Sequence, residues 1–167
     1  MTPTEQFIKT LESLKAGDLG RLRNLAGLPL DESVDGFDLF AGLWWPLRQK
    51  NQRAPRREVA WLIAKLYAFR PLRHLDGANL AAQLGRVSSK DSKAALRRQG
   101  RFDDMLLLPL AKIEPSLYWA LALIADGSAS LDWVRLTDDL SIWEHEKTRL
   151  KWATDFLNNL PQRRMPC

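Results

Sequence analysis

The sequence predicts an all-α protein with eight or nine helices, and three observations support this fold class. Apolar residues recur at helical spacings of three and four along nearly the whole chain. Residues that cap or end helices separate these segments. No segment alternates apolar and polar residues for long enough to predict a strand with confidence, and no solenoid-length repeat is present.

The N-terminal helices follow from apolar stripes and turn residues. A first stripe spans residues 7–14, and Asp18 is placed to cap a short second helix. A third stripe spans residues 37–47, where Pro46 is expected to kink or end the helix. Residues 48–55 have the composition of a linker.

A central helix is expected over residues 56–69. Pro55 suits its first position, and the segment is apolar on almost every face except at Lys65. This pattern predicts a buried helix at the centre of the fold. The next segment, residues 78–87, predicts a short helix ended by Gly85.

The second half predicts four further helices. A basic segment begins near Lys90, a helix begins at Pro115, Asp132 caps the next, and residues 144–160 form the last. Their short connections fit an antiparallel bundle. The expected organisation is one helical domain over residues 1–160, with an N-terminal lobe (1–87), a C-terminal bundle (88–160) and a frayed basic tail (161–167).

Composition limits the compartment and the chemistry. The only cysteine is Cys167, which fits a reducing compartment, and residues 1–14 lack the features of a signal peptide. The longest apolar run is too short to span a bilayer. We therefore expect a cytoplasmic protein with no membrane partner.

No catalytic residue, metal site or cofactor is expected from the motifs. The chain has two histidines, His74 and His145, and Arg149 stands where a zinc-binding helix would place its second histidine. The pair Asp138–Asp139 would point about 100° apart on a helix, which disfavours a shared metal ion. A metal-dependent enzyme remains the third interpretation.

Two basic clusters dominate the surface chemistry. No acidic residue occurs between Leu39 and Arg57, a stretch that contains five cations: Arg48, Lys50, Arg53, Arg56 and Arg57. In a helix over residues 90–101, four cations would fall within an arc of about 80° on a face opposed to the apolar one: Lys90, Lys93, Arg97 and Arg101. Like charges at this spacing oppose helix formation, which suggests an anionic partner, with a solvated face as the alternative.

The kind of nucleic-acid contact follows from what accompanies these charges. The planar guanidinium group of arginine can make two hydrogen bonds to a phosphate, and no recognisable base-reading module is present. The clusters therefore predict backbone tracking along one continuous groove or two nearby patches.

Trp44 and Trp45 are adjacent in a chain with seven tryptophans. One of the two is expected to leave the core and to anchor a partner protein.

Several segments, taken in order, resemble a known family. They are LKAGDLGRLRNLAG, FRPLRHLDGANLAAQLGR, the RF and LLL of residues 101–108, LDWVRLTDDLSIW and KWATDFL. The chain resembles the CasB family, the small subunit of type I-E CRISPR Cascade complexes, from about Phe7 to Leu157. The most specific part comprises Leu131, Asp132, Trp133, Leu140, Trp143, Trp152 and Phe156.

The resemblance implies a non-catalytic, all-helical subunit of an antiviral complex. Family members occur as two copies against the subunits that hold the CRISPR RNA. They help to hold the target strand and the displaced strand of the R-loop through basic residues. The implied partners are therefore other Cascade subunits, CRISPR RNA, both DNA strands and a second copy of the chain. A free-standing helical nucleic-acid-binding protein, such as a repressor, is the alternative.

Residue by residue, the resemblance matches four basic positions and the charge pattern adds others. Arg23, Arg56, Arg86 and Arg101 match the family motifs, although Asn24 replaces the second member of a basic pair. Arg86 and Arg101 have an alternative role, in which each arginine pairs with a carboxylate inside the bundle instead of binding nucleic acid. A further family position is Lys147 or Lys151, between which the sequence does not choose. The complete candidate set is Arg23, Arg48, Arg53, Arg56, Arg57, Arg86, Lys93, Arg97, Arg98 and Arg101.

Overall fold

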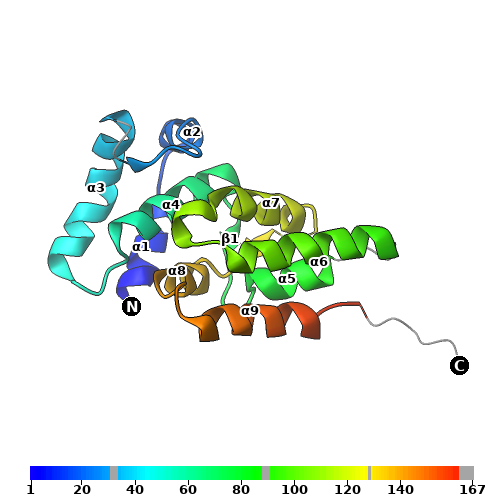
Figure 1. The fold of residues 1–167 in the computed structure, drawn as a ribbon. Helices are drawn as coiled ribbons and strands as arrows, with labels where there is room; N and C mark the ends of the chain where they lie inside the picture. Colours follow the sequence, from blue (N-terminus) through cyan, green and yellow to red (C-terminus); the bar gives the residue numbers. More distant parts are fainter. Residues whose placement is uncertain (31–33, 88–90, 128, 162–167) are drawn as a thin grey trace, which may run out of the picture.

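The computed structural model describes residues 1–30, 34–87, 91–127 and 129–161, and helices dominate these ranges (Figure 1). The all-α fold class is confirmed, with nine α-helices in the described ranges. Their bounds are α1 Pro3–Glu12, α2 Ala16–Arg23, α3 Val34–Lys50, α4 Arg57–Phe69, α5 Leu80–Arg86, α6 Ser92–Leu107, α7 Glu114–Ala125, α8 Trp133–Ser141 and α9 Glu146–Asn158. A short 3-10 turn, η2, spans Leu110–Lys112.

One very short parallel pair of strands joins the two halves of the chain. β1 (Arg73–His74) pairs with β2 (Ser130–Leu131), with Arg73 opposite Ser130 and His74 opposite Leu131. Two residues in each strand are too few to leave a period-two pattern in the sequence. The pair holds the segment that leads into α5 beside the segment that leads into α8.

The central helix is α4, as its apolar composition predicts. Every residue from Val59 to Ala68 is buried, and the helix contacts α2, α7 and α8. Because all its faces are covered, α4 organises one core to which α1, α5, α6, α7, α8 and α9 also contribute. The single-domain organisation with two lobes stays a prediction. Residues 162–167 of the predicted tail lie outside the described ranges.

A buried ion pair crosses this core. Lys65 Nζ of α4 lies 2.7 Å from Glu114 Oε1 of α7, and it also donates to the carbonyl of Leu28 at 3.0 Å. Glu114 Oε2 accepts from Gly27 N and from the Tyr118 hydroxyl, each at 2.7 Å. Burial lowers the pKa of Lys65, and the hydrogen bond and charge of Glu114 oppose this shift. The pair therefore ties α4, α7 and the segment after α2 together.

The contact between α5 and α9 depends on a residue without a side chain. Gly85 is buried within α5, and a Cβ there would overlap the Phe156 carbonyl oxygen and lie 3.2 Å from Asn159 Cβ. Arg86 Nε also donates to Asn159 Oδ1 at 3.0 Å. The sequence-based expectation that Gly85 ends the helix is therefore wrong. Gly85 allows the α9 backbone to approach.

Three other helix boundaries differ from the sequence-based expectation. Pro46 does not end α3, which continues to Lys50, so of the two expected outcomes only a kink is left; Phe40 stacks on Trp44 and contacts Trp61 of α4 edge-on. Pro55 precedes α4 rather than opening it, and its carbonyl accepts the Trp44 indole N–H. Asp18 lies in the first turn of α2 instead of capping it.

None of the helices in the described ranges combines the length and the apolar character that a bilayer crossing requires.

Candidate nucleic-acid interface

The first basic cluster surrounds the connection between α3 and α4, and we call it the linker cluster: Arg48, Lys50, Arg53, Arg56 and Arg57. Arg48 is half-buried and donates from Nη1 to the Ala54 carbonyl, which fixes the path of the connection. Arg53 and Arg56 are exposed, and no hydrogen bond or ion pair engages their side chains within the described ranges. These two cations are therefore accessible to an anion.

The second cluster lies on α6, and we call it the α6 cluster: Lys93, Arg97, Arg98 and Arg101. Asp91 caps the helix by accepting from Lys93 N at 3.2 Å. The predicted helix is confirmed from Ser92 onward, whereas Lys90 lies outside the described residues. Phe102 is buried on the side of the helix away from Lys93 and Arg97, so these two cations face outward, whereas Met105 is buried near Arg98 and Arg101.

Two members of the α6 cluster are held by contacts within the protein. Arg98 is half-buried and donates from Nη1 to the Val87 carbonyl. The Arg101 guanidinium carbon lies 4.9 Å from the centre of the Trp119 ring, which is a cation–π contact. Lys93 and Arg97 are exposed, and their side chains have no partner among the residues that the structure describes.

The remaining candidates also make structural contacts. Arg23 Nε donates to the Ala68 carbonyl at 2.9 Å and thereby satisfies a carbonyl at the end of α4. Arg86 binds Asn159, so its internal partner is an amide rather than a carboxylate. Both residues are nevertheless exposed, and each keeps further donors on the outer side.

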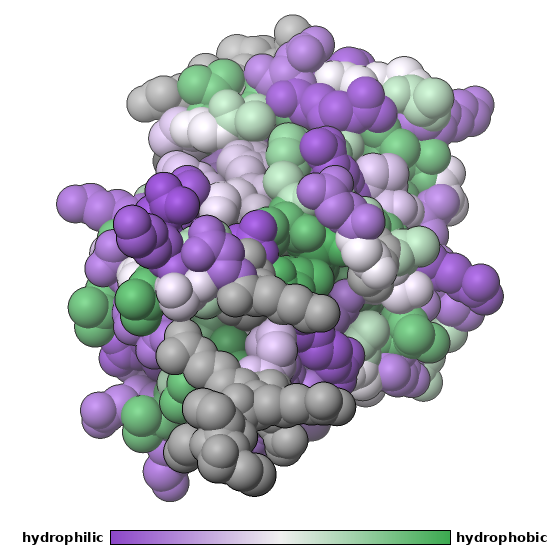
Figure 2. All heavy atoms as spheres, turned by 90° about the vertical axis from the view of Figure 1, so that its right-hand side faces the viewer, coloured by the Kyte–Doolittle hydropathy of each residue, from purple (hydrophilic) through white to green (hydrophobic). Residues whose placement is uncertain are grey.

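The two clusters lie on elements at opposite edges of the molecule. In Figure 1 the α3–α4 connection lies at the left edge of the molecule, whereas α6 extends to the right edge. Figure 2 shows the right-hand face, where hydrophilic side chains project around a smaller hydrophobic area. The expectation of a continuous groove or nearby patches is therefore wrong in its geometry, because charge spacing along the chain carries no information on how α3 and α6 are oriented.

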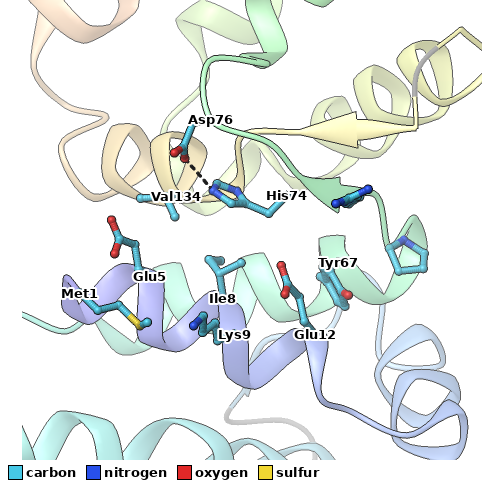
Figure 3. A pocket seen from close by; sticks show the side chains of 11 residues that line it. Met1, Glu5, Ile8, Lys9, Glu12, Tyr67, His74, Asp76 and Val134 are labelled. Carbon is cyan, nitrogen blue, oxygen red and sulfur yellow. Dashed lines mark hydrogen bonds and ion pairs between the residues drawn. The ribbon is translucent and has the colours of Figure 1, made fainter.

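A separate cleft lies between α1, β1 and α8 (Figure 3). Its volume is about 670 Å³, and Glu5 and Glu12 of α1 face His74 across it. Burial and the charge of Glu12 raise the pKa of Tyr67, which also lines the cleft. With carboxylates among its walls, this cleft is less suited to a phosphate backbone than the two clusters.

One group beside the cleft has the residue types of a metal site. His74, Asp76 and Asp132 place ligand atoms within 4.8 Å of one another. Trp133 N donates to His74 Nδ1 at 3.2 Å, which leaves Nε2 as the protonated nitrogen, 2.9 Å from Asp76. Asp132 accepts from Gly77 N and Arg135 N. Asp132 and His74 therefore already accept backbone N–H groups from the first turn of α8, and Asp132 caps the helix as the sequence predicts.

The adjacent carboxylates of Asp138 and Asp139 on α8 bind two different neighbouring helices, α1 and α9. Asp138 Oδ1 accepts from Thr4 of α1 at 2.8 Å. Asp139 Oδ2 accepts from the Trp152 indole N–H at 2.7 Å and lies 3.7 Å from Arg135 Nε. Burial raises the pKa of Asp139, and the Trp152 hydrogen bond and nearby cations oppose the shift. The two carboxylates therefore join helices and do not share a site.

Replacing Asp139 by Ala is expected to lower the free energy of unfolding by about 1–3 kcal/mol, because the Trp152 N–H loses its acceptor. Asp139→Asn is the matched control and keeps an acceptor oxygen. Because the pKa of Asp139 is raised in the folded state, wild type should gain stability relative to Asp139→Asn as the pH falls from neutral toward about 4. Urea unfolding at both pH values measures this difference, and equal costs for the two variants would contradict the assigned hydrogen bond.

Taken together, these features define an all-helical protein with two separated cationic surfaces. The family model described as CRISPR-associated protein Cse2 matches residues 18–157. The chain therefore belongs to the Cse2 family of CRISPR-associated proteins, also called CasB. Membership identifies a Cascade-associated subunit and implies association with other components of the CRISPR complex.

Solved structures of the family share the fold. A Cse2-family protein from Thermus thermophilus is 24% identical, with a TM-score of 0.73 over 95% of this chain and 99% of that chain. CasB from M. ruber is 19% identical, with a TM-score of 0.72 over 95% and 94%. CasB from Thermobifida fusca is 17% identical, with a TM-score of 0.67 over 92% and 94%. No curated protein matches the chain.

Proposed function

We propose that this protein is a non-catalytic small subunit that binds nucleic-acid backbone in a type I-E Cascade-like complex. It stabilises the R-loop formed by CRISPR RNA, the target strand and the displaced strand. The guide RNA supplies sequence specificity, and this subunit supplies charge and shape. Its other partners are the remaining Cascade subunits and a second copy of the chain, in the cytoplasm.

The observation that carries the proposal is the state of four cations. Arg53, Arg56, Lys93 and Arg97 are exposed, and within the described ranges their side chains lack hydrogen-bond and ion-pair partners. Exposed cations without internal partners can release counterions when they meet phosphates. Because they occur at both ends of the subunit, one copy can contact a strand at two separated places.

Reversing the two unpartnered cations of α6, with Lys93→Glu and Arg97→Glu together, is expected to weaken target binding by the assembled complex. Losing two phosphate contacts should make the plot of log affinity against log salt shallower by about 1.4 for a single strand. The loss should be equal for unrelated guide–target pairs, because backbone contacts carry no base information. Target binding is measured across a salt series for two matched pairs.

The matched control reverses two exposed lysines outside both clusters, Lys9→Glu and Lys112→Glu, at the same change in net charge. An equal loss in this control would show a general charge effect and contradict the assignment. Unchanged affinity and salt slope in the α6 variant would also contradict the assignment. Loss for one target sequence only would favour base reading and the free-standing repressor.

A further inference from the structure

An exposed tryptophan stands beside the linker cluster. Trp45 is 51% exposed, which confirms that one member of the Trp44–Trp45 pair leaves the core. With Phe40, Ala41, Trp44 and Arg57 it lines an open cavity of about 350 Å³. The cavity therefore brings together an aromatic surface from α3 and a cation from the start of α4.

The aromatic surface is rigidly supported from below. Phe40 is buried and stacks on Trp44, with ring centres 5.5 Å apart and planes 11° apart. The Trp44 indole N–H is held by the Pro55 carbonyl at 2.7 Å. Trp45 lies on this support, with its ring centre 5.9 Å from that of Trp44. An exposed ring that is already oriented loses little conformational freedom when it binds a partner.

The charges around the cavity favour an anionic occupant. Arg57 lines it, Arg53 and Arg56 lie in the adjoining connection, and no acidic residue occurs from Leu39 to Arg57. An apolar protein surface would account for Trp45 but not for the cations of the adjoining connection. Single-stranded nucleic acid accounts for both, because each nucleotide presents a flat base and a phosphate.

We propose that Trp45 is a stacking platform for an unpaired base of single-stranded nucleic acid, whose neighbouring phosphates contact Arg53 and Arg56. The inference rests on the proposed function and adds a binding mode to it. A base within a duplex is already stacked, so the site selects an unpaired strand. The sequence-based expectation that the exposed tryptophan anchors a protein becomes the competing outcome of the test.

The test uses the full chain and the assembled complex with two probes, oligo(dT) and an abasic oligomer of equal length and charge. Trp45→Ala should weaken oligo(dT) binding about 5- to 150-fold and leave both abasic binding and the salt slope unchanged. Trp45→Phe should retain most of the affinity, whereas Trp45→Leu, which is apolar but cannot stack, should resemble Trp45→Ala. Because Trp45 is 51% exposed, all three variants should still fold, which thermal unfolding checks.

The variant Arg53→Glu/Arg56→Glu separates the two proposals. It should weaken binding of both probes and make the salt slope shallower. If this variant loses binding while Trp45→Ala does not, the stacking site is wrong and the backbone function stands. If neither variant changes binding of either probe, the linker cluster has neither role. If Trp45→Ala prevents assembly and leaves oligo(dT) binding by the full chain intact, Trp45 is a protein contact, and the stacking proposal is overturned.

Discussion

Replacing Glu114 by Ala is expected to lower the free energy of unfolding by about 3–5 kcal/mol, because it leaves the buried ammonium group of Lys65 without its charged partner. The side chain of Lys65 is 2% exposed, so its ammonium group depends on partners within the protein. Gly27 N and the Tyr118 hydroxyl lose their acceptor at the same time. Chemical denaturation of the isolated chain measures the loss.

The double variant Lys65→Met/Glu114→Ala tests whether the ion pair is the cause. Removing the unpaired ammonium should restore part of the stability, because the two side chains interact directly. Tyr118→Phe, which deletes only one hydrogen bond to Glu114, should cost about 1 kcal/mol. If the stability losses of the single variants Lys65→Met and Glu114→Ala simply add up in the double variant, the ion pair does not couple α4 to α7.

Replacing Gly85 by Ala is expected to cost about 3 kcal/mol, at the upper end for an overpacked core. The new Cβ would overlap the Phe156 carbonyl oxygen, and backbone atoms cannot move aside as the end of a flexible side chain can. α9 must therefore shift away from α5, which also strains the bond between Arg86 and Asn159. Thermal unfolding and chemical denaturation measure the cost.

Gly100→Ala is the matched control for this change. Gly100 also lies inside a helix, but a Cβ there meets no atom within 4 Å. Since Ala favours the helix, this control should be stabilised by about 0.5–1 kcal/mol. Opposite signs for the two substitutions are the expected result. Stabilisation by both would mean that α5 and α9 lie farther apart than the structure places them.

Several local features of the fold were predicted from the sequence, although the cap assigned to Asp18 and the helix start assigned to Pro55 were wrong. Asp132 caps α8, Pro115 lies in the first turn of α7, and the all-round apolar segment 56–69 becomes the buried α4. Each of these depends on residues within one or two turns, where capping and periodicity act. In α6, Lys93 and Arg97 lie on the side away from buried Phe102, as the spacing predicts, whereas Arg98 lies on the buried side.

Features that depend on distant residues could not be predicted. Lys65 stands out as the polar residue of an apolar helix, but its partner Glu114 is 49 residues away. Gly85 has the sequence pattern of a helix end, and only the approach of α9 explains its place inside α5. The failure has one physical cause, because helix orientation is set by packing between segments that periodicity treats separately.

The candidate site was likewise predictable in its local features but not in the contacts between distant residues. Charge clustering identified the basic segments, but the sequence did not separate accessible cations from those held internally. Arg98 binds the Val87 carbonyl and Arg101 lies over Trp119, and no spacing rule connects these partners. The cavity beside Trp45 was also missed as a unit. The signal for it was an adjacent tryptophan pair followed by an acid-free basic run.

The α5–α9 contact has a consequence for biosynthesis. Arg86 and Asn159 are separated by 73 residues, and at about 5–20 residues per second a ribosome needs roughly 4–15 s to make the intervening chain. Throughout that interval the face of α5 around Gly85 has no covering helix. A nascent chain therefore leaves this apolar face uncovered until α9 emerges, and the core is completed only after α9 has been translated.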